Sequence, residues 1–444
     1  METFFIKALQ LILSLSILVA VHEFGHFLFA RIFKVRVEKA YLFFDPWFSL
    51  FKYKSKKNHT EYGIGWLPLG GYVKLAGMID ESMDKEQMAQ PAKPWEFRIK
   101  PAWQRLIIMA AGVIFNFILA IFILSMVVFT WGDRYLPLKN VKNGMTFSQE
   151  AKDAGFRDGD VLVSADGKDL VLRGSVLDMN VLMQYLDAEE VIVQREGALR
   201  TITMPEGFGD EVIASKNTPY EFWTPAKVDS VVAETAADKA GLMKGDSLVA
   251  VNQKPISSFA QLRAELQTNK NDSVTISYVR AGQVSETRAY VDSAAVLGFT
   301  VSSGMSKDDY KHDDYGFFAS FPKGVDLGVN TLKAYVAQMR FVFNKEGVKN
   351  LGGFGAIGNM FPAQWDWLHF WTMTAFLSLV LAFMNILPIP ALDGGHIMFL
   401  LYEMITRRPP SEKFMEYAQI TGMVLLFGLL IFANGNDIVR AIFD

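Results

Sequence analysis

Four long apolar segments alternate along the chain with stretches of mixed polarity. Each has the roughly 20 apolar residues that a helix needs to cross a bilayer core of about 30 Å. They run approximately from Phe4 to Phe33, Leu106 to Trp131, Leu368 to Leu387 and Met415 to Ala433. We therefore expect a multi-span α-helical membrane protein with four transmembrane helices. The first segment is too long for a signal peptide and lacks a small-residue cleavage site, so we expect it to be retained.

The region between the second and third segments contains an internal repeat. Residues 154–163, AGFRDGDVLV, recur at residues 240–249 as AGLMKGDSLV. Each copy predicts a short helix that ends in Ala-Gly, a Gly-Asp turn and then an alternating strand. The repeat predicts two inserted α+β domains in tandem, at residues 132–210 and 220–295.

Two further segments flank these regions. Glycines punctuate an apolar stretch at residues 62–77, which predicts a membrane-associated β-hairpin whose edge could pair with an extended peptide. A surface hairpin without a function is the alternative. Residues 296–367 form a linker that contains an amphipathic segment around Leu327 to Phe343.

Positive charges near the ends of the apolar segments predict the orientation. They lie after the first segment, before the second, and between the third and fourth: Lys34, Arg36, Lys39, Arg98, Lys100, Arg105, Arg407, Arg408 and Lys413. Those loops should be cytoplasmic. Both termini and the tandem domains then face the periplasm of a bacterial inner membrane.

Composition narrows the possible functions. The chain is 51% hydrophobic and 20% charged, with a net charge of -3, which gives no case for nucleic-acid binding. It has no cysteine. Disulfides and thiolate metal ligands are therefore excluded, while cysteine usage does not indicate whether the compartment is oxidising or reducing.

The first apolar segment contains three ionisable residues within five positions. Each costs roughly 2.5 to 3.5 kcal/mol at the centre of a membrane helix, so they need a partner or a function. The motif is His22-Glu23-Phe24-Gly25-His26. Two histidines at i and i+4 share one helix face and can bind one Zn²⁺, with Glu23 as the base that accepts a proton from the attacking water. The alternative is that these side chains only line the interior of a helix bundle.

A third ligand is available after the third apolar segment. Asp393 would complete a tetrahedral site with water in the fourth position. It could instead cap the helix that begins near Gly394. In the expected topology Asp393 and the two histidines lie at the same depth, toward the cytoplasmic side. His396 is a competing ligand, which we expect to lie outside the metal shell or at the helix start.

Taken in order, these motifs resemble the site-2 protease family of intramembrane zinc metalloproteases, and within it the bacterial regulator-of-sigma-E type with tandem periplasmic PDZ domains. The resemblance rests on the His-Glu-x-x-His motif, Gly112 to Asn116, the Ala-Gly-Leu-x-x-Gly-Asp repeat, and the Asn-x-x-Pro-x-Pro and Leu-Asp-Gly signatures. It covers nearly the whole chain. One departure is the stretch Gly352 to Gly358, where relatives carry a Ser-Gly-Pro-like segment.

The resemblance implies a role for each site residue. Zinc, one ion per chain, is bound by His22, His26 and Asp393, and Glu23 is the catalytic base. Asn116 lies near the site, where it contacts an oxyanion or ties two helices together. The residues implied in substrate binding are Asn385, Pro388, Pro390, Gly70, Gly71 and Tyr72.

The function expected from this resemblance is cleavage within transmembrane segments. Substrates would be pre-trimmed single-span proteins of the anti-sigma-factor type, and also remnant signal peptides, in envelope stress signalling. The PDZ-like domains would bind peptides or chain termini, or exclude untrimmed substrates by bulk. Around them, residues 1–131 and 368–444 carry the membrane helices. The alternative is an inactive membrane adaptor; a transporter is less favoured because no inverted repeat is evident.

Overall fold

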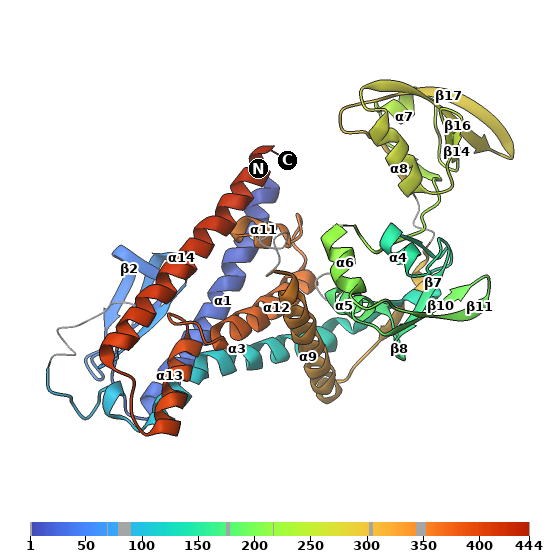
Figure 1. Ribbon diagram of the computed structural model, residues 1–444. Coiled ribbons are helices and arrows are strands. Elements are labelled where there is room, and N and C mark those ends of the chain that lie inside the picture. The colour runs from blue at the N-terminus through green and yellow to red at the C-terminus, as the bar shows by residue number, and fades with distance from the viewer. Residues whose placement is uncertain are drawn as a thin grey trace. The chain divides into compact units, whose positions relative to one another are not determined.

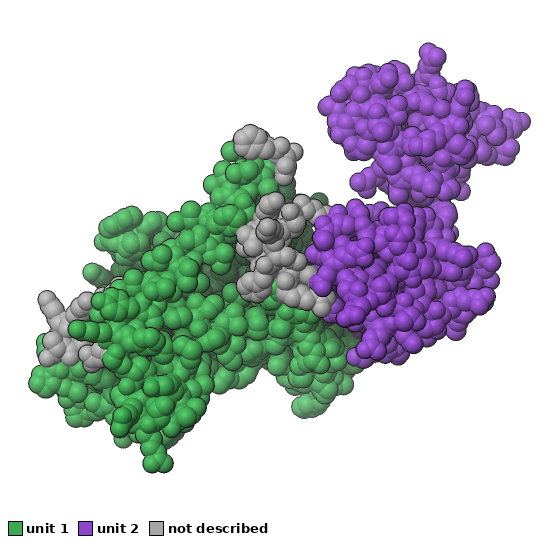
Figure 2. Space-filling model, in the orientation of Figure 1, with its two compact units in different colours: residues 1–133, 175–180, 313–444 green, residues 134–174, 181–312 purple. Residues whose placement is uncertain are grey.

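The computed structural model describes residues 2–68, 70–78, 90–174, 178–215, 217–301, 305–342 and 352–443 (Figure 1). It divides into two compact units, coloured separately in Figure 2. The first comprises Met1–Asp133, Ser175–Asn180 and Asp313–Asp444, and the second comprises Arg134–Gly174 and Val181–His312. Each unit is described by itself.

The four predicted membrane helices are confirmed in the first unit. Helices long and apolar enough to cross a membrane occur at Glu2–Ile32, Ala102–Trp131, Trp367–Ile386 and Lys413–Arg440. They belong to α1 (Glu2–Ile32), α3 (Ala102–Trp131), α12 (Trp367–Ile386) and α14 (Glu412–Phe443). The last helix continues through the polar residues that follow Ala433 and ends at Phe443. The chain is a membrane protein that also carries β-structure.

Four further helical elements lie in the described part of this unit. They are η1 (Phe97–Ile99), α9 (Phe317–Val342), α11 (Phe354–Asn359) and α13 (Asp393–Thr406). Helix α3 is central, because α1, α9, α12 and α13 all pack against it. The amphipathic segment expected near Leu327 is helical, and its Leu327 is buried against Leu124 and Val128 of α3. The helices that pack around α3 therefore position the residues of the site.

A four-stranded sheet follows α1 in the same unit. Its strands are β1 (Val37–Leu42), β2 (Phe44–Lys54), β3 (Glu61–Leu67) and β4 (Tyr72–Leu75). Their order is β2-β3-β1-β4, with β1 parallel to β3 and antiparallel to β4. The hairpin predicted at residues 62–77 is therefore wrong, because β1 lies between β3 and β4. The antiparallel neighbour of β3 is β2.

Glycines that suggested a hairpin turn have a packing role instead. A Cβ atom on Gly63 would lie 2.2 Å from the Tyr41 ring, and one on Gly65 would lie 2.1 Å from the carbonyl oxygen of Phe44. These positions need glycine because neighbouring strands cross them closely. In the strand order of this sheet, β4 is an edge strand.

The second unit contains the two copies of the sequence repeat. The first copy forms a sheet in the order β11-β10-β7-β8, and the second forms a sheet in the order β15-β14-β16-β17. In the first copy the elements are β6 (Met145–Phe147), α4 (Gln149–Asp153), β7 (Val161–Ala165), β8 (Lys168–Asp169), β9 (Val171–Leu172), α5 (Met179–Leu186), β10 (Glu190–Arg195), β11 (Ala198–Thr203) and α6 (Phe208–Ser215).

The second copy has the corresponding strands and helices. They are β13 (Val228–Val231), α7 (Ala236–Lys239), β14 (Ser247–Val251), β15 (Lys254–Pro255), α8 (Phe259–Thr268), β16 (Asp272–Arg280), β17 (Gln283–Val291) and β18 (Phe299–Val301). The remaining short elements are β5 (Asp133–Pro137), η2 (Leu138–Asn140), β12 (Tyr220–Phe222), η4 (Lys307–Asp309) and β19 (Lys311–Asp313). Leu248, Val274 and Ile276 are central in the core of this copy.

The Gly-Asp turns of the repeat have the same function in both copies. Asp160 and Asp246 are each 1% exposed. Arg195 binds Asp160 through two hydrogen bonds of 2.7 Å, and Arg280 binds Asp246 in the same way. The repeated sequence thus encodes a buried carboxylate that ties the turn to a strand of the adjacent sheet.

Candidate metal centre

Two glycines bring α1 and α3 close together beside the histidines. His22 and His26 lie one turn apart on the buried face of α1. A Cβ atom on Gly25 would lie 2.6 Å from the carbonyl oxygen of Ala111, and one on Gly112 would lie 2.4 Å from Nε2 of His26. Small residues allow such close helix packing in membranes. Gly112 leaves the space into which both imidazoles point.

Asp393 reaches the histidines through the turn between α12 and α13. Ala391 has a positive φ of 78°, and a Cβ atom on Gly394 would lie 2.0 Å from the carbonyl oxygen of Leu387. Asp393 is the first residue of α13, whose N-cap is Leu392. The Asp393 side chain makes no capping hydrogen bond in the described part of the chain, so the capping alternative loses its support.

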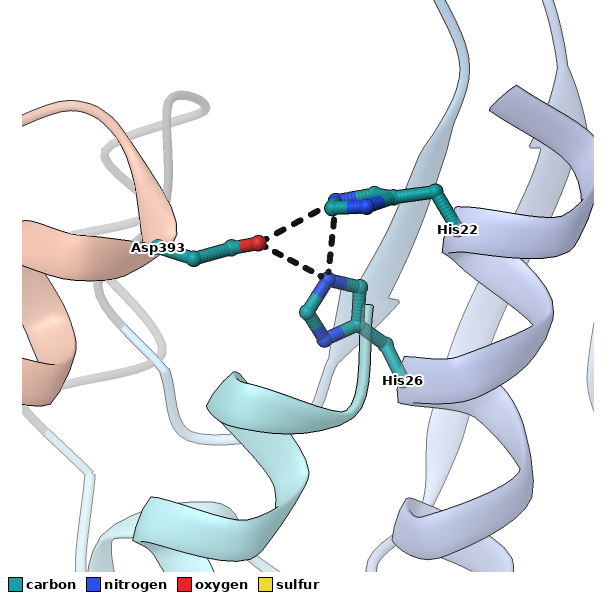
Figure 3. A group of neighbouring side chains, drawn as sticks. All are labelled: His22, His26 and Asp393. Atoms are coloured by element: carbon teal, nitrogen blue, oxygen red, sulfur yellow. Dashed lines mark hydrogen bonds and ion pairs between the residues drawn. The ribbon is translucent and has the colours of Figure 1, made fainter. Parts of the chain in front are cut away.

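Three ligand atoms from α1 and α13 form a nearly equilateral triangle (Figure 3). Asp393 Oδ2 lies 3.1 Å from His22 Nε2 and 3.3 Å from His26 Nε2. The two Nε2 atoms lie 3.2 Å apart. Both histidines are buried and Asp393 is half-buried. Figure 3 shows the three side chains converging on one point.

The triangle fits a tetrahedral zinc ion. Ligands at about 2.0 to 2.2 Å from zinc lie about 3.3 to 3.6 Å from one another, within a few tenths of an ångström of the separations observed here. Asp393 Oδ2 is buried and has no hydrogen-bond partner among the described residues. Two imidazole nitrogens and a carboxylate oxygen are a donor set that zinc favours. A cation at their centre satisfies all three atoms.

The Nδ1 atoms of the two histidines, which face away from the ligand triangle, contact groups on α3. His26 Nδ1 lies 2.8 Å from the carbonyl oxygen of Ile108, so Nδ1–H donates there and Nε2 is left for a metal. His22 Nδ1 lies 3.2 Å from the side-chain amide of Asn116. Sequence reasoning missed Ile108, because a backbone acceptor leaves no signal in the residue type. Asn116 was predicted near the site and lies there.

Glu23 lies between the histidines on α1 and faces β4. The backbone N–H of Val73 donates to its carboxylate. A Cβ atom on Gly71 would lie 3.5 Å from Glu23 Cγ. No residue type singled out Val73, because its contribution is again a backbone group. The edge strand β4 therefore adjoins the carboxylate that was predicted to be the base.

The remaining predicted residues divide into two groups. Asn385 contacts the cluster, with Nδ2 at 3.4 Å from His22 Nε2, and Pro388 and Pro390 lie in the turn that leads to Asp393. Tyr72 is directed elsewhere, since its hydroxyl donates to Asp45 at 3.0 Å and its ring stacks on Tyr41.

Two other predicted positions lie outside the ligand triangle. A Cβ atom on Gly70 would lie 2.6 Å from the Phe44 ring, so Gly70 packs within the sheet. His396, the competing ligand, is absent from the triangle and lines a cavity with Arg105 and Glu403. None of the three ligand residues lines this cavity, which agrees with the expectation that His396 lies outside the metal shell.

Comparison with known proteins decides the family. Residues 10–429 match the model of Peptidase family M50. The chain belongs to this family. The site-2 proteases are its intramembrane members, so the resemblance found in the sequence is confirmed.

Relatives of this M50 peptidase align over nearly their whole length. It is 31% identical over 456 residues to a protein of Vibrio cholerae named "Putative zinc metalloprotease", with 97% of each chain covered. It is 28% identical over 464 residues to "Regulator of sigma-E protease RseP" of Escherichia coli K12, again with 97% of each chain covered. The M50 chain is therefore a metalloprotease, and its three clustered residues are the candidate zinc ligands.

Proposed function

We propose that the chain is an intramembrane zinc endopeptidase that hydrolyses peptide bonds within transmembrane segments of other proteins. The observation that carries the proposal is the triangle of His22, His26 and Asp393, with Glu23 beside it on a helix apolar enough to span a membrane. One zinc ion per chain fits this triangle. Three protein ligands leave a fourth position free, which is typical of catalytic rather than structural zinc.

Glu23 is the proposed base. Zinc bound at the three ligands supplies the Lewis acid that polarises a carbonyl and lowers the pKa of water. The Glu23 carboxylate accepts a proton from the attacking water and then delivers it to the leaving amine. The hydrogen bond from the Val73 N–H orients this carboxylate beside the ligand triangle.

The β4 edge is the proposed binding place for the scissile segment. A helical substrate has its peptide groups hydrogen-bonded within the helix, so cleavage requires local unwinding. An unwound segment needs new backbone partners, which an edge strand can offer. β4 has β1 on one side only and lies next to Glu23. Asn385, Pro388 and Pro390 would contact the segment from the opposite side, next to His22.

The two repeat copies are the proposed substrate filter. Their Ala-Gly-Leu-x-x-Gly-Asp signature favours PDZ-like domains, at residues 132–210 and 220–295, that bind peptides or chain termini or act by bulk. The positive charges near the membrane helices favour a bacterial inner-membrane orientation with these domains in the periplasm. The metal centre then lies toward the cytoplasmic side, and trimmed substrates reach it from the membrane.

The relatives named as regulators of sigma-E support a place for this chain in envelope stress signalling. The corresponding substrates are single-span proteins of the anti-sigma-factor type after an earlier cut, and remnant signal peptides. Both kinds present one apolar helix with a short outer end. That chemistry suits an active site placed within the membrane.

Exchange of one carboxylate tests the proposal. The wild type, Glu23→Gln and Glu2→Gln are purified in detergent, assayed for zinc, and incubated with a trimmed single-span substrate. Glu2 is an exposed residue at the other end of the same helix, so it controls for loss of a charge on α1. We expect stoichiometric zinc in all three proteins. Cleavage should occur in the wild type and in Glu2→Gln only.

Two results would count against the proposal. Cleavage by Glu23→Gln at the wild-type rate would remove Glu23 as the base. Absence of both zinc and cleavage in the wild type would favour the membrane adaptor, in which the periplasmic domains bind envelope proteins without catalysis.

A further inference from the structure

An apolar patch in the first unit is uncovered. Strand β2 forms one edge of the sheet, and large side chains on it and on its neighbour β3 are exposed. The apolar patch consists of Trp47 (90% exposed), Phe48 (56%), Leu50 (66%), Phe51 (60%) and Ile64 (40%). Trp47 and Phe48 both stack on Trp66. Large exposed apolar side chains gathered on two neighbouring strands mark a surface that contacts lipid or protein.

A cluster of lysines adjoins the apolar patch. We call Lys52, Lys54, Lys56 and Lys57 the lysine turn, since they end β2 and begin the connection to β3. All four are exposed. None forms an ion pair with a described carboxylate. Glu61, which lies opposite Lys54 in the strand register, accepts a hydrogen bond from Tyr41 at 2.7 Å.

Contacts with α1 give the depth of each part of the sheet. The turn before β4 touches α1 near Val19, because a Cβ atom on Gly71 would lie 2.8 Å from Val19 Cγ1. At the other end of the sheet, Arg31 donates to the hydroxyl of Thr60. Val19 and Arg31 are separated by about 18 Å along the helix at 1.5 Å per residue. The strands thus run alongside α1 over more than half the thickness of a bilayer core.

The strand register gives the level of the apolar patch and of the lysine turn along α1. Phe51 is opposite Ile64, and Lys54 is opposite Glu61, the neighbour of Thr60. Lys54 and the turn that follows it therefore lie level with Arg31, near the end of α1, and Lys52, opposite Gly63, lies next to the apolar patch. The apolar patch extends from there toward the level of Val19. This is the order in which headgroups and acyl chains follow one another in a leaflet.

We propose that the lysine turn binds the phosphate groups of anionic phospholipids in the cytoplasmic leaflet while the apolar patch lies among their acyl chains. The proposal rests on the orientation given under the proposed function. Polybasic segments beside a membrane span attract anionic lipids, with a gain of about fivefold in local affinity per lysine. The lipid contact fixes the depth of the sheet, and through β4 the position of the edge next to Glu23.

Charge and placement favour lipid over a protein as the occupant. A soluble acidic partner could bind the lysines, but it could not cover apolar side chains that lie alongside a membrane-spanning helix. A second copy of the chain would bring four more lysines to the same place, and like charges repel. Anionic lipid matches both the lysine turn and the apolar patch.

A fluorescent label tests the proposal on the full-length protein. The chain has no cysteine, so Phe51→Cys gives a single labelling site. The labelled protein is placed in nanodiscs of phosphatidylcholine and phosphatidylglycerol that contain one nitroxide-bearing lipid. Two preparations have the same overall composition and carry the nitroxide on an acyl chain of either lipid. The ratio of quenching by the anionic lipid to quenching by the zwitterionic lipid reports local enrichment.

We expect a ratio of roughly two to five at position 51. Exchange of all four lysines for glutamine should return the ratio to about one, as should 0.5 M salt in the unmodified protein. A label at Ile431→Cys on α14, where the side chain is 72% exposed, serves as the control and should give about one. No quenching by either lipid at position 51 would show that the patch is outside the bilayer.

A ratio that is the same with lysine and with glutamine would overturn the role of the lysine turn. Neither readout uses proteolysis, so the measurement can be made on Glu23→Gln as well. Failure of the lipid proposal is thereby distinguished from failure of the proposed catalytic function.

Discussion

The side-chain amide of Asn116 on α3 faces Nδ1 of His22 at 3.2 Å, on the side of the ring away from Asp393. A histidine that offers Nε2 to a metal carries its proton on Nδ1 and needs an acceptor there. Asn116 Oδ1 is buried and has no hydrogen-bond partner among the described residues. Amide orientation is assigned from hydrogen bonds, and turning the amide makes Oδ1 that acceptor. This favours Asn116 as a group that holds His22 over one that contacts an oxyanion.

Exchange of Asn116 should act on metal affinity. We expect Asn116→Leu to weaken zinc binding by about 10- to 100-fold, since loss of a partner behind a metal-binding histidine has effects of that size. Asn116→Asp keeps an acceptor and should retain zinc. Competition with a chelator of known affinity measures the change.

A neighbouring hydroxyl supplies the control for Asn116. Ser378→Ala removes a hydrogen bond of 2.8 Å to the backbone carbonyl of Asn116 and leaves the amide in place. It should leave zinc affinity unchanged. If Asn116→Leu held zinc as tightly as the wild type and lost only activity, the oxyanion role would be preferred.

Gly112 should tolerate no side chain. The methyl group of Gly112→Ala would overlap His26 Nε2 at 2.4 Å and His22 Cε1 at 2.6 Å. We expect loss of zinc and of cleavage in a protein that still folds. Gly428→Ala, on α14, is the matched control because nothing lies within 4 Å of its added Cβ. Zinc content after purification measures the effect, and normal zinc in Gly112→Ala would contradict the close packing of α1 and α3.

The backbone of Val73 should matter more than its side chain. Val73→Pro removes the N–H that donates to Glu23 and leaves zinc ligands untouched. We expect cleavage to fall by at least about 10-fold, which is less than the roughly 10²- to 10⁴-fold that a general base itself contributes, with zinc retained. Val73→Ala keeps the N–H and should keep most activity. Equal rates for the two variants would mean that this hydrogen bond does not orient Glu23.

The sequence predicted the parts of the centre that depend on residue type. Histidines at i and i+4 in an apolar helix, and an aspartate after a later span, are unusual enough to point to one another. The groups that contact the ligand side chains from behind were harder to predict. Ile108 acts through its carbonyl and Val73 through its N–H, and any residue except proline offers an N–H.

Strand pairing was the other limit of prediction. Glycines at positions 63 and 65 suggested turns, but they permit close strand packing against Tyr41 and Phe44. That choice depends on β1, which is distant from the predicted turn in sequence and intervenes between β3 and β4. Local sequence patterns indicate where strands occur more reliably than they indicate which strands pair with one another.

Lowering the pH should destabilise the second repeat copy because Asp246 becomes protonated. The bidentate hydrogen bonds from Arg280 lower the pKa of Asp246 below its ordinary value. A carboxylate with a lowered pKa in the folded state stabilises it above the unfolded-state pKa of about 3.9, and this contribution disappears as the pH falls through the folded-state pKa. We expect hydrogen-exchange protection of β14 and β16 to fall below about pH 4.

A variant separates this ion pair from general acid unfolding. Asp246→Asn in the full-length protein should lower protection of β14 and β16 roughly tenfold at neutral pH, because a charged hydrogen bond to a buried group is lost. It should also flatten the response to acid. Asp229→Asn removes an exposed partner of Lys244 and is the control. An unchanged acid response in Asp246→Asn would assign the effect to other carboxylates.

The glycine-rich stretch that departs from the family pattern is bound to the last membrane helix. Asp437 on α14 accepts hydrogen bonds from the backbone N–H groups of Gly353 and Ala356, at 2.9 and 3.0 Å. Asn434 accepts one from Phe354 at 3.2 Å. These side chains satisfy N–H groups at the start of α11 that have no partner within the helix.

The same segment is also tied to the first membrane helix. Lys7 donates to Asn359 at 3.2 Å, and Gln10 donates to the carbonyl of Pro362 at 3.0 Å. Residues 353–362 therefore join the ends of α1 and α14 that lie away from His26 and Asp393. Through this junction the end of α14 is tied to the end of α1.

Gly353→Ala should break this junction on the α14 side. Its Cβ would lie 2.6 Å from Asn434 Oδ1 and 2.9 Å from the Asn434 backbone nitrogen, so the segment must move away. Each hydrogen bond lost should lower exchange protection of residues 353–359 about fivefold. Gly358→Ala is the control, since its nearest neighbour, Leu11 Cδ2, is at an ordinary 3.6 Å. Equal protection in the two variants would mean that contacts with α1 alone hold the segment, and that α14 is free to move independently.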